Sequence, residues 1–134
     1  MVNKVIIILK TIISMIFLQT LFFKFSAAPE SVYIFSLIGM EPYGRIGSGV
    51  AEFLVVLLLV WPQTTVIGAF ASLFIISVAL YFHITILGIV VLDDYGLLFF
   101  LALVVFISSI LILYFKKDEV VTSVNRIWKR NGKR

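Results

Sequence analysis

Three ionisable residues interrupt long apolar stretches of the sequence: Lys24, Glu52 and His83. Residues three or four positions apart share one face of a helix. The three faces defined in this way are Lys10, Ile13, Phe17, Thr20 and Lys24; Arg45, Gly49, Glu52 and Val56; and Gly68, Ser72, Ile76, Ala79 and His83. Ionisable groups inside a membrane are costly and usually mark ion, proton or ligand sites, and histidine changes charge near neutral pH. These residues could exchange protons or bind a polar head group.

The available residue types exclude several other kinds of chemistry. The chain has no cysteine, so it forms no disulfide and holds no iron–sulfur cluster. A single histidine argues against a metal site built from protein ligands, and phosphate-binding loops and nucleophile motifs are absent. We therefore expect no catalytic residue, no metal ligand and no catalytic activity of the chain on its own. The net charge of +4 comes from the C-terminal tail and indicates no nucleic-acid partner.

The composition indicates that the chain lies in a lipid bilayer. Hydrophobic residues make up 62% of the 134 residues, charged residues 13%, and the mean hydropathy is +1.17. A helix needs about 20 mostly apolar residues to cross the hydrocarbon core. Four stretches meet this requirement: residues 5–25, 43–61, 65–87 and 95–115. The sequence predicts an all-α membrane protein whose residues 1–115 form a four-transmembrane-helix antiparallel bundle.

The first stretch is similar to a secretory signal peptide, because a lysine precedes it and SAAPE follows it. The apolar run is too long for a signal peptide, however, and Lys10 interrupts it. We expect this stretch to be retained as a helix. In the connection that follows, Pro29 is typical of a helix start and Gly39 of a helix end. This pattern predicts a short interfacial helix over residues 29–39.

The basic residues predict the orientation of the chain. Lysine and arginine are retained preferentially on the cytoplasmic side, and residues 116–134 hold seven of the eleven basic residues. We expect a multi-pass protein of the cytoplasmic (inner) membrane, with a basic cytoplasmic tail and the N-terminus on the same side. The tail is interpreted as an orientation anchor, and the alternative is contact with anionic lipid head groups.

This topology brings polar residues from separate spans to the outer half of the bundle. Lys24 ends the first span there, His83 lies roughly 6 Å below Leu87, and Glu52 lies roughly 9 to 15 Å inside, from a rise of 1.5 Å per residue. The predicted ligand-binding or polar cluster comprises Lys24, Arg45, Glu52, His83 and Tyr95. The predicted helix-packing residues are Gly49, Gly68, Ser72 and Ala79, because helices in lipid associate through small residues.

Several stretches carry a resemblance to a known family: FLQTLFFKF, GRIGSGVAEFLVVLLLVWP, and FHITILGI with DYGLLFFLALVVF. Over about residues 11–115 the chain resembles the DoxX family of small four-helix integral membrane proteins. Lys24, Gly49, Glu52 and His83 match recurrent family positions. The resemblance implies a four-helix bundle and, for some relatives, membership of membrane redox complexes that exchange electrons with quinone or sulfur compounds. Without cysteine, this chain supplies no thiol chemistry of its own.

Three functions follow as hypotheses. The first is an accessory or binding subunit of a quinone- or sulfur-linked redox complex, with a polar pocket that takes quinone or lipid. Its partners would be the bilayer, a membrane or periplasmic redox protein, and a second copy of the chain in a homo-oligomer. The second is a small proton-coupled transporter, ranked lower because Lys10 alone is charged in the cytoplasmic half. The third is a membrane-protein assembly factor in which Glu52 pairs with Lys24 or Arg45 to hold helices together.

Overall fold

The computed structural model describes residues 1–133, and over this range the chain is helical, with no strand. Four helices are long and apolar enough to cross a membrane. They are α1 (Val2–Phe25), α3 (Tyr43–Val60), α4 (Thr65–Phe82) with its continuation η2 (His83–Leu87), and α5 (Leu97–Phe115). The shorter helices are α2 (Pro29–Leu37) and α6 (Lys117–Asn131). The predicted helical class and the four candidate membrane spans are confirmed.

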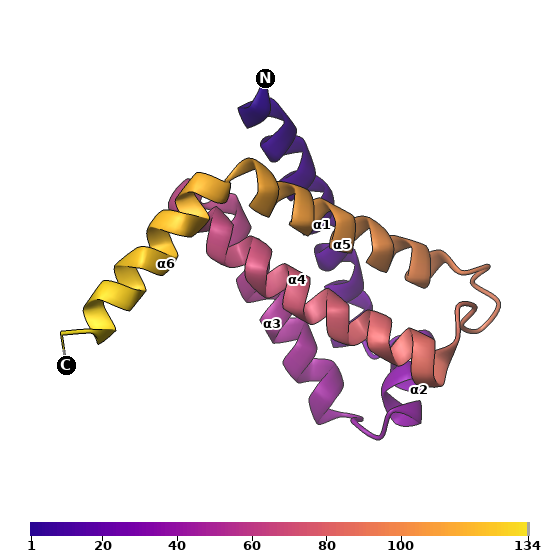
Figure 1. Ribbon diagram of the computed structural model, residues 1–134. Coiled ribbons are helices and arrows are strands. Elements are labelled where there is room, and N and C mark those ends of the chain that lie inside the picture. Colours follow the sequence, from indigo (N-terminus) through magenta and orange to yellow (C-terminus); the bar gives the residue numbers. More distant parts are fainter. Residues whose placement is uncertain (134) are drawn as a thin grey trace.

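The four long helices pack side by side (Figure 1). Helix α1 packs against α3 and α5, and α4 packs against the same two helices. The core between them is apolar, and its most buried side chains include Ile13, Phe17, Leu59, Val105 and Ile112. Many large apolar side chains on the outward faces are exposed. Such a surface is compatible with contact with lipid and is unsuited to water.

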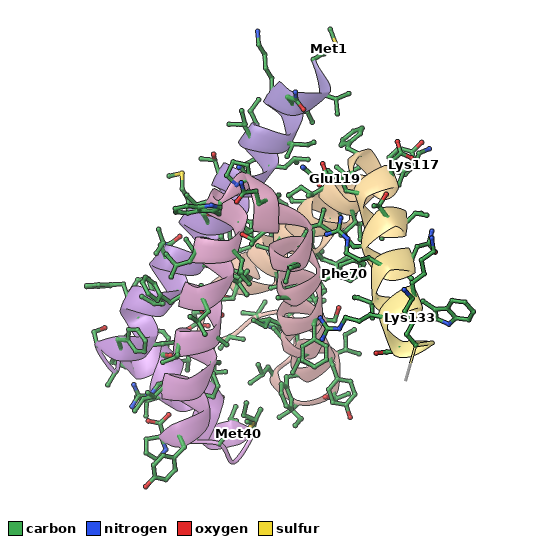
Figure 2. The ribbon with its side chains drawn as sticks, turned by 90° about the vertical axis from the view of Figure 1, so that its left-hand side faces the viewer. Met1, Met40, Phe70, Lys117, Glu119 and Lys133 are labelled. Atoms are coloured by element: carbon green, nitrogen blue, oxygen red, sulfur yellow. The ribbon has the colours of Figure 1, made fainter. Side chains whose placement is uncertain are left out.

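Two ends of the molecule can be distinguished. Helix α2 contacts α1, α3 and η2, so the end of α1, the start of α3 and the end of α4 meet there. We call this the α2 end. Met40, just before α3, lies far from Met1 and Lys117, which mark the opposite end, called here the α6 end (Figure 2). Lys24, Glu41, Arg45 and His83 all belong to segments near the α2 end.

Helices α3 and α4 form a tight hairpin. They are joined by a single 3₁₀ turn, η1 (Pro62–Thr64), and the hydroxyl of Thr64 donates to the carbonyl of Leu58 at 2.8 Å. A Cβ atom at Gly68 would lie 2.9 Å from the backbone nitrogen of Leu59. The two helix backbones therefore approach each other so closely that the packing requires a glycine at position 68.

Two segments have structure that the sequence prediction did not contain. The α-helical part of the third span ends at Phe82, and the next five residues form the wider π-helical turn η2. The tail, for which no helix was predicted, folds into α6. Acidic residues in the first turn of α6 and basic residues in its last turn favour this helix, because they complement the helix dipole.

Candidate functional site

The centre of the candidate site is an ion pair between α1 and α3. Lys24 Nζ lies 2.5 Å from Glu52 Oε1, and the two side chains are 15% and 7% exposed. Thr20, one turn before Lys24, donates its hydroxyl to Glu52 Oε2 at 3.1 Å. Both carboxylate oxygens thus have a partner on α1. The helical spacing places Thr20 and Lys24 on one face, which is why one helix supplies both contacts.

Arg45 forms a second polar contact beside this pair. Its Nε donates to both carboxylate oxygens of Glu41, at 2.8 and 3.0 Å, and its Nη1 donates to the backbone carbonyl of Lys24. The last carbonyls of a helix lack partners within the helix, and a cation is favourable beside them. Arg45 therefore caps α1 while Glu41 holds the guanidinium. Sequence reasoning missed Glu41, although its i,i+4 spacing to Arg45 was a usable signal.

Aromatic side chains border the ion pair. The ring centroid of Phe35, on α2, lies 5.7 Å from Lys24 Nζ. At Gly49, one turn before Glu52, a Cβ atom would lie 2.9 Å from the ring of Phe25. The glycine thus makes room for the last residue of α1. We use the name Lys24 site for Thr20, Lys24, Phe35, Arg45 and Glu52.

His83 belongs to a different set of contacts. Its Nδ1 lies 2.8 Å from the carbonyl oxygen of Gly88. Because a carbonyl oxygen only accepts hydrogen bonds, Nδ1 carries the proton. The imidazole also packs edge-to-face on Phe99 of α5, with the centroids 5.6 Å apart. Within residues 1–133 no hydrogen bond or ion pair joins His83 to the Lys24 site.

The loop between η2 and α5 is organised by Asp94. Its Oδ1 accepts the backbone N–H groups of Val91 at 3.0 Å and Gly96 at 2.8 Å, and its Oδ2 accepts that of Leu98 at 3.1 Å. Burial by itself would raise the pKa of Asp94, but these three N–H groups and the nearby His83 hold that pKa below its ordinary value. The sequence alone did not predict this role for Asp94.

Of the predicted cluster, the structure brings Lys24, Arg45 and Glu52 together and places His83 with the loop that precedes α5. Tyr95 is 97% exposed, in a left-handed conformation with φ 57°. It lies on the surface of that loop. The predicted single cluster is therefore divided between the α1–α3 pair and the α4–α5 pair.

The predicted helix-packing residues lie between helices. Gly49 adjoins Phe25, and Gly68 adjoins the backbone of α3. Ser72 Oγ lies 2.9 Å from Ser109 Oγ on α5, and both serines are fully buried. Ala79 is half-buried against the core. At the other end of the molecule, Lys10 Nζ donates to the carbonyl of Val60 at 3.5 Å.

The described part of the chain holds no group of three metal-ligating side chains, and in it every buried side-chain nitrogen and oxygen has a hydrogen-bond partner. Two open hollows lie on the polar side of α6, lined by residues such as Thr122 and Arg126, away from the Lys24 site. Comparisons with protein-family models, curated proteins and solved structures found no match.

Proposed function

We propose that this chain is a DoxX-like protein of the cytoplasmic membrane. The four long helices form an antiparallel bundle, with both termini in the cytoplasm and α2 in the opposite interface. Three observations support this arrangement: the exposed apolar faces of the long helices, the position of α2 across the end of α1, and the concentration of basic residues after α5.

We further propose that the protein is a binding or accessory subunit of a redox complex and has no catalytic activity of its own. The Lys24 site takes the head group of a quinone or a similar amphiphile. The observation that carries this proposal is the partly exposed ion pair between Lys24 and Glu52, 28 residues apart in the chain. An ionisable pair at membrane depth is the default candidate for function, because such pairs add little stability as glue, about 1 kcal/mol.

The chemistry of the site suits a carbonyl-bearing ring. An ammonium carries three N–H donors, and Glu52 accepts one of those of Lys24. The ammonium can donate a further hydrogen bond to a carbonyl oxygen of the head group. The ring of Phe35 supplies an aromatic wall at 5.7 Å from Nζ. Glu52, which is itself held by the hydroxyl of Thr20, fixes the position of the ammonium.

The proposal is tested by titrating the protein in nanodiscs with decylubiquinone and following the midpoint of thermal unfolding. The wild type should be stabilised. The double variant Glu52→Gln/Lys24→Met should show no stabilisation, because it removes both charges without leaving one unpaired. A matched control, Ser72→Ala/Ser109→Ala, breaks another polar contact between helices and should keep the ligand response. A wild type that does not respond, and that yields no quinone or lipid by mass spectrometry of the purified protein, would exclude amphiphile binding.

A second candidate function is assembly of another membrane protein, with the Lys24 site purely structural. Complete pairing of the buried polar side-chain atoms in residues 1–133 favours it, because such a site needs no ligand. In that case the same titration gives no stabilisation, while Glu52→Gln still destabilises the protein. The titration therefore distinguishes the two functions, because Glu52→Gln destabilises the protein in either case.

A further inference from the structure

Helix α6 has an apolar face that the rest of the chain leaves uncovered. Val121, Val124, Ile127 and Trp128 recur at the spacing of one helix face, and they are 57%, 56%, 63% and 79% exposed. The packing of α6 is chiefly against α5. A soluble helix would hide such a face in a core, so this face needs a partner outside the chain.

The opposite face of α6 is basic. Arg126, Lys129 and Arg130 lie on the side away from the apolar face. The first turn of that side also carries Asp118 and Glu119, and the helix as a whole has four basic and two acidic side chains, so its net charge is positive. A helix with lysine and arginine on one face and tryptophan and aliphatic residues on the other is typical of segments that lie in the membrane interface. An orientation anchor alone requires the charges and does not require the apolar face.

The start of α6 is fixed at the level where the membrane surface is expected. One residue, Lys116, separates α6 from the candidate span α5. Two exposed aromatic residues belong to this end, namely Trp61 after α3 and Tyr114 in the last turn of α5. Tryptophan and tyrosine are enriched at membrane–water interfaces. The first residue of α6 is therefore held near the head groups.

The direction of α6 is consistent with a helix that lies along the membrane surface. Figure 1 shows that α6 does not continue the line of α5 but turns off from its end and extends away from the four long helices. Two contacts stabilise the bend between α5 and α6. Lys116 Nζ lies 2.9 Å from Glu119 Oε1, and Lys117 Nζ lies 5.3 Å from the centroid of the Tyr114 ring.

We propose that α6 lies in the membrane surface and binds anionic phospholipid. The face formed by Val121, Val124, Ile127 and Trp128 enters the boundary between head groups and acyl chains, and the basic residues contact lipid phosphates. Four apolar side chains form a small surface. Binding therefore depends on anionic lipid and weakens as the salt concentration increases.

The test uses the full chain with Trp61→Phe, so that Trp128 is its sole tryptophan. The protein is placed, one copy per disc, in nanodiscs of phosphatidylcholine with or without phosphatidylglycerol. In the anionic discs, Trp128 should be quenched by lipids brominated on their acyl chains and protected from aqueous acrylamide. This protection should decrease in neutral discs and at high salt. Equal exposure to acrylamide in all discs would overturn the proposal.

Matched variants distinguish the apolar face from the helix itself. Val124→Asn places an amide on the apolar face and should abolish the protection of Trp128. Ser123→Asn places the same amide on the polar side and should leave it unchanged, since these residue types differ little in helix propensity. Equal loss in both variants would contradict insertion of the apolar face. Protection that appears only with two copies per disc would instead identify a second copy of the chain as the partner.

Discussion

At the residue scale, the partners of Glu52 determine what its loss would do. Glu52→Gln leaves the ammonium of Lys24 without its anion, and we expect unfolding in detergent or nanodisc to become easier by roughly 2 kcal/mol. This is less than for a fully buried pair, because Lys24 is partly exposed. Adding Lys24→Met should restore part of the loss. If the stability losses of the two single variants simply add in the double variant, the two side chains do not interact.

The pH dependence of Asp94 provides a second residue-scale prediction. Its pKa is lower in the folded protein than in the unfolded chain, so its carboxylate contributes stability above about pH 4 that is lost as the pH falls below that value. Asp94→Asn should therefore lower the free energy of unfolding at neutral pH by about 1 kcal/mol, because the amide replaces one of the two accepting oxygens and removes the charge. The difference from the wild type should narrow below about pH 4.

The control for this measurement is Asp93→Asn. Asp93 is the exposed neighbour of Asp94 and has a positive φ that asparagine tolerates. Its substitution should change stability little at either pH. A gap between wild type and Asp94→Asn that stays constant from neutral to acid pH would show that the charge of Asp94 is not what stabilises the loop.

The sequence predicts part of the site because helical spacing is a local property. The faces that carry Lys24 and Glu52 could be derived in this way, and the structure buries Glu52, Arg45 and Gly49 on one face of α3. Spacing does not determine which cation meets which anion, since that depends on how α1 and α3 rotate against each other. The bond from His83 to Gly88 depends on the π-helical turn η2, which a period of 3.6 residues does not predict.

At the scale of the element, the α3–α4 hairpin should depend on the absence of a side chain at Gly68. Gly68→Ala places a methyl group 2.9 Å from the backbone of Leu59, and backbone cannot move aside as a flexible side chain can. We expect a loss of roughly 1–3 kcal/mol, as in overpacked cores. Thermal unfolding in nanodiscs measures the effect.

Gly47→Ala is the matched control for the hairpin. Gly47 lies within α3, and a Cβ there would meet nothing within 4 Å. Alanine favours helix over glycine, so this variant should be unchanged or slightly more stable. If both alanine variants behave alike, the loss at position 68 does not come from the close approach of the helices.

An interpretation of the C-terminal tail from its charge alone does not predict helix α6. Its basic residues predict the orientation of the chain, whereas its helical structure is indicated by the apolar residues at positions 120, 121, 124, 127 and 128. Those positions follow a helical repeat, so the helix was predictable from the sequence. Its direction relative to α5 was not, because one connecting residue permits many crossing angles.

At the scale of the whole molecule, the proposed orientation is tested with single cysteines. The native chain has no cysteine, so Glu30→Cys and Ser123→Cys each provide one reactive site. In whole cells an impermeant thiol reagent should label the cysteine at position 30 and not that at position 123. Both should react after lysis, which controls for accessibility. The reverse pattern would invert the bundle and place α6 on the outer leaflet.

The order in which the chain is synthesised also affects how the partners of the ion pair enter the membrane. Synthesis delivers Lys24 and Thr20 first, and the carboxylate of Glu52 arrives 28 residues after the lysine. When α3 enters the membrane, the ammonium and the hydroxyl that it needs are already present on α1. In the proposed membrane topology, α1 therefore makes insertion of the acidic helix α3 less costly. Lys24→Met should therefore reduce the inserted fraction of α3 during translation into microsomes, before α4 or α5 exists to hold it.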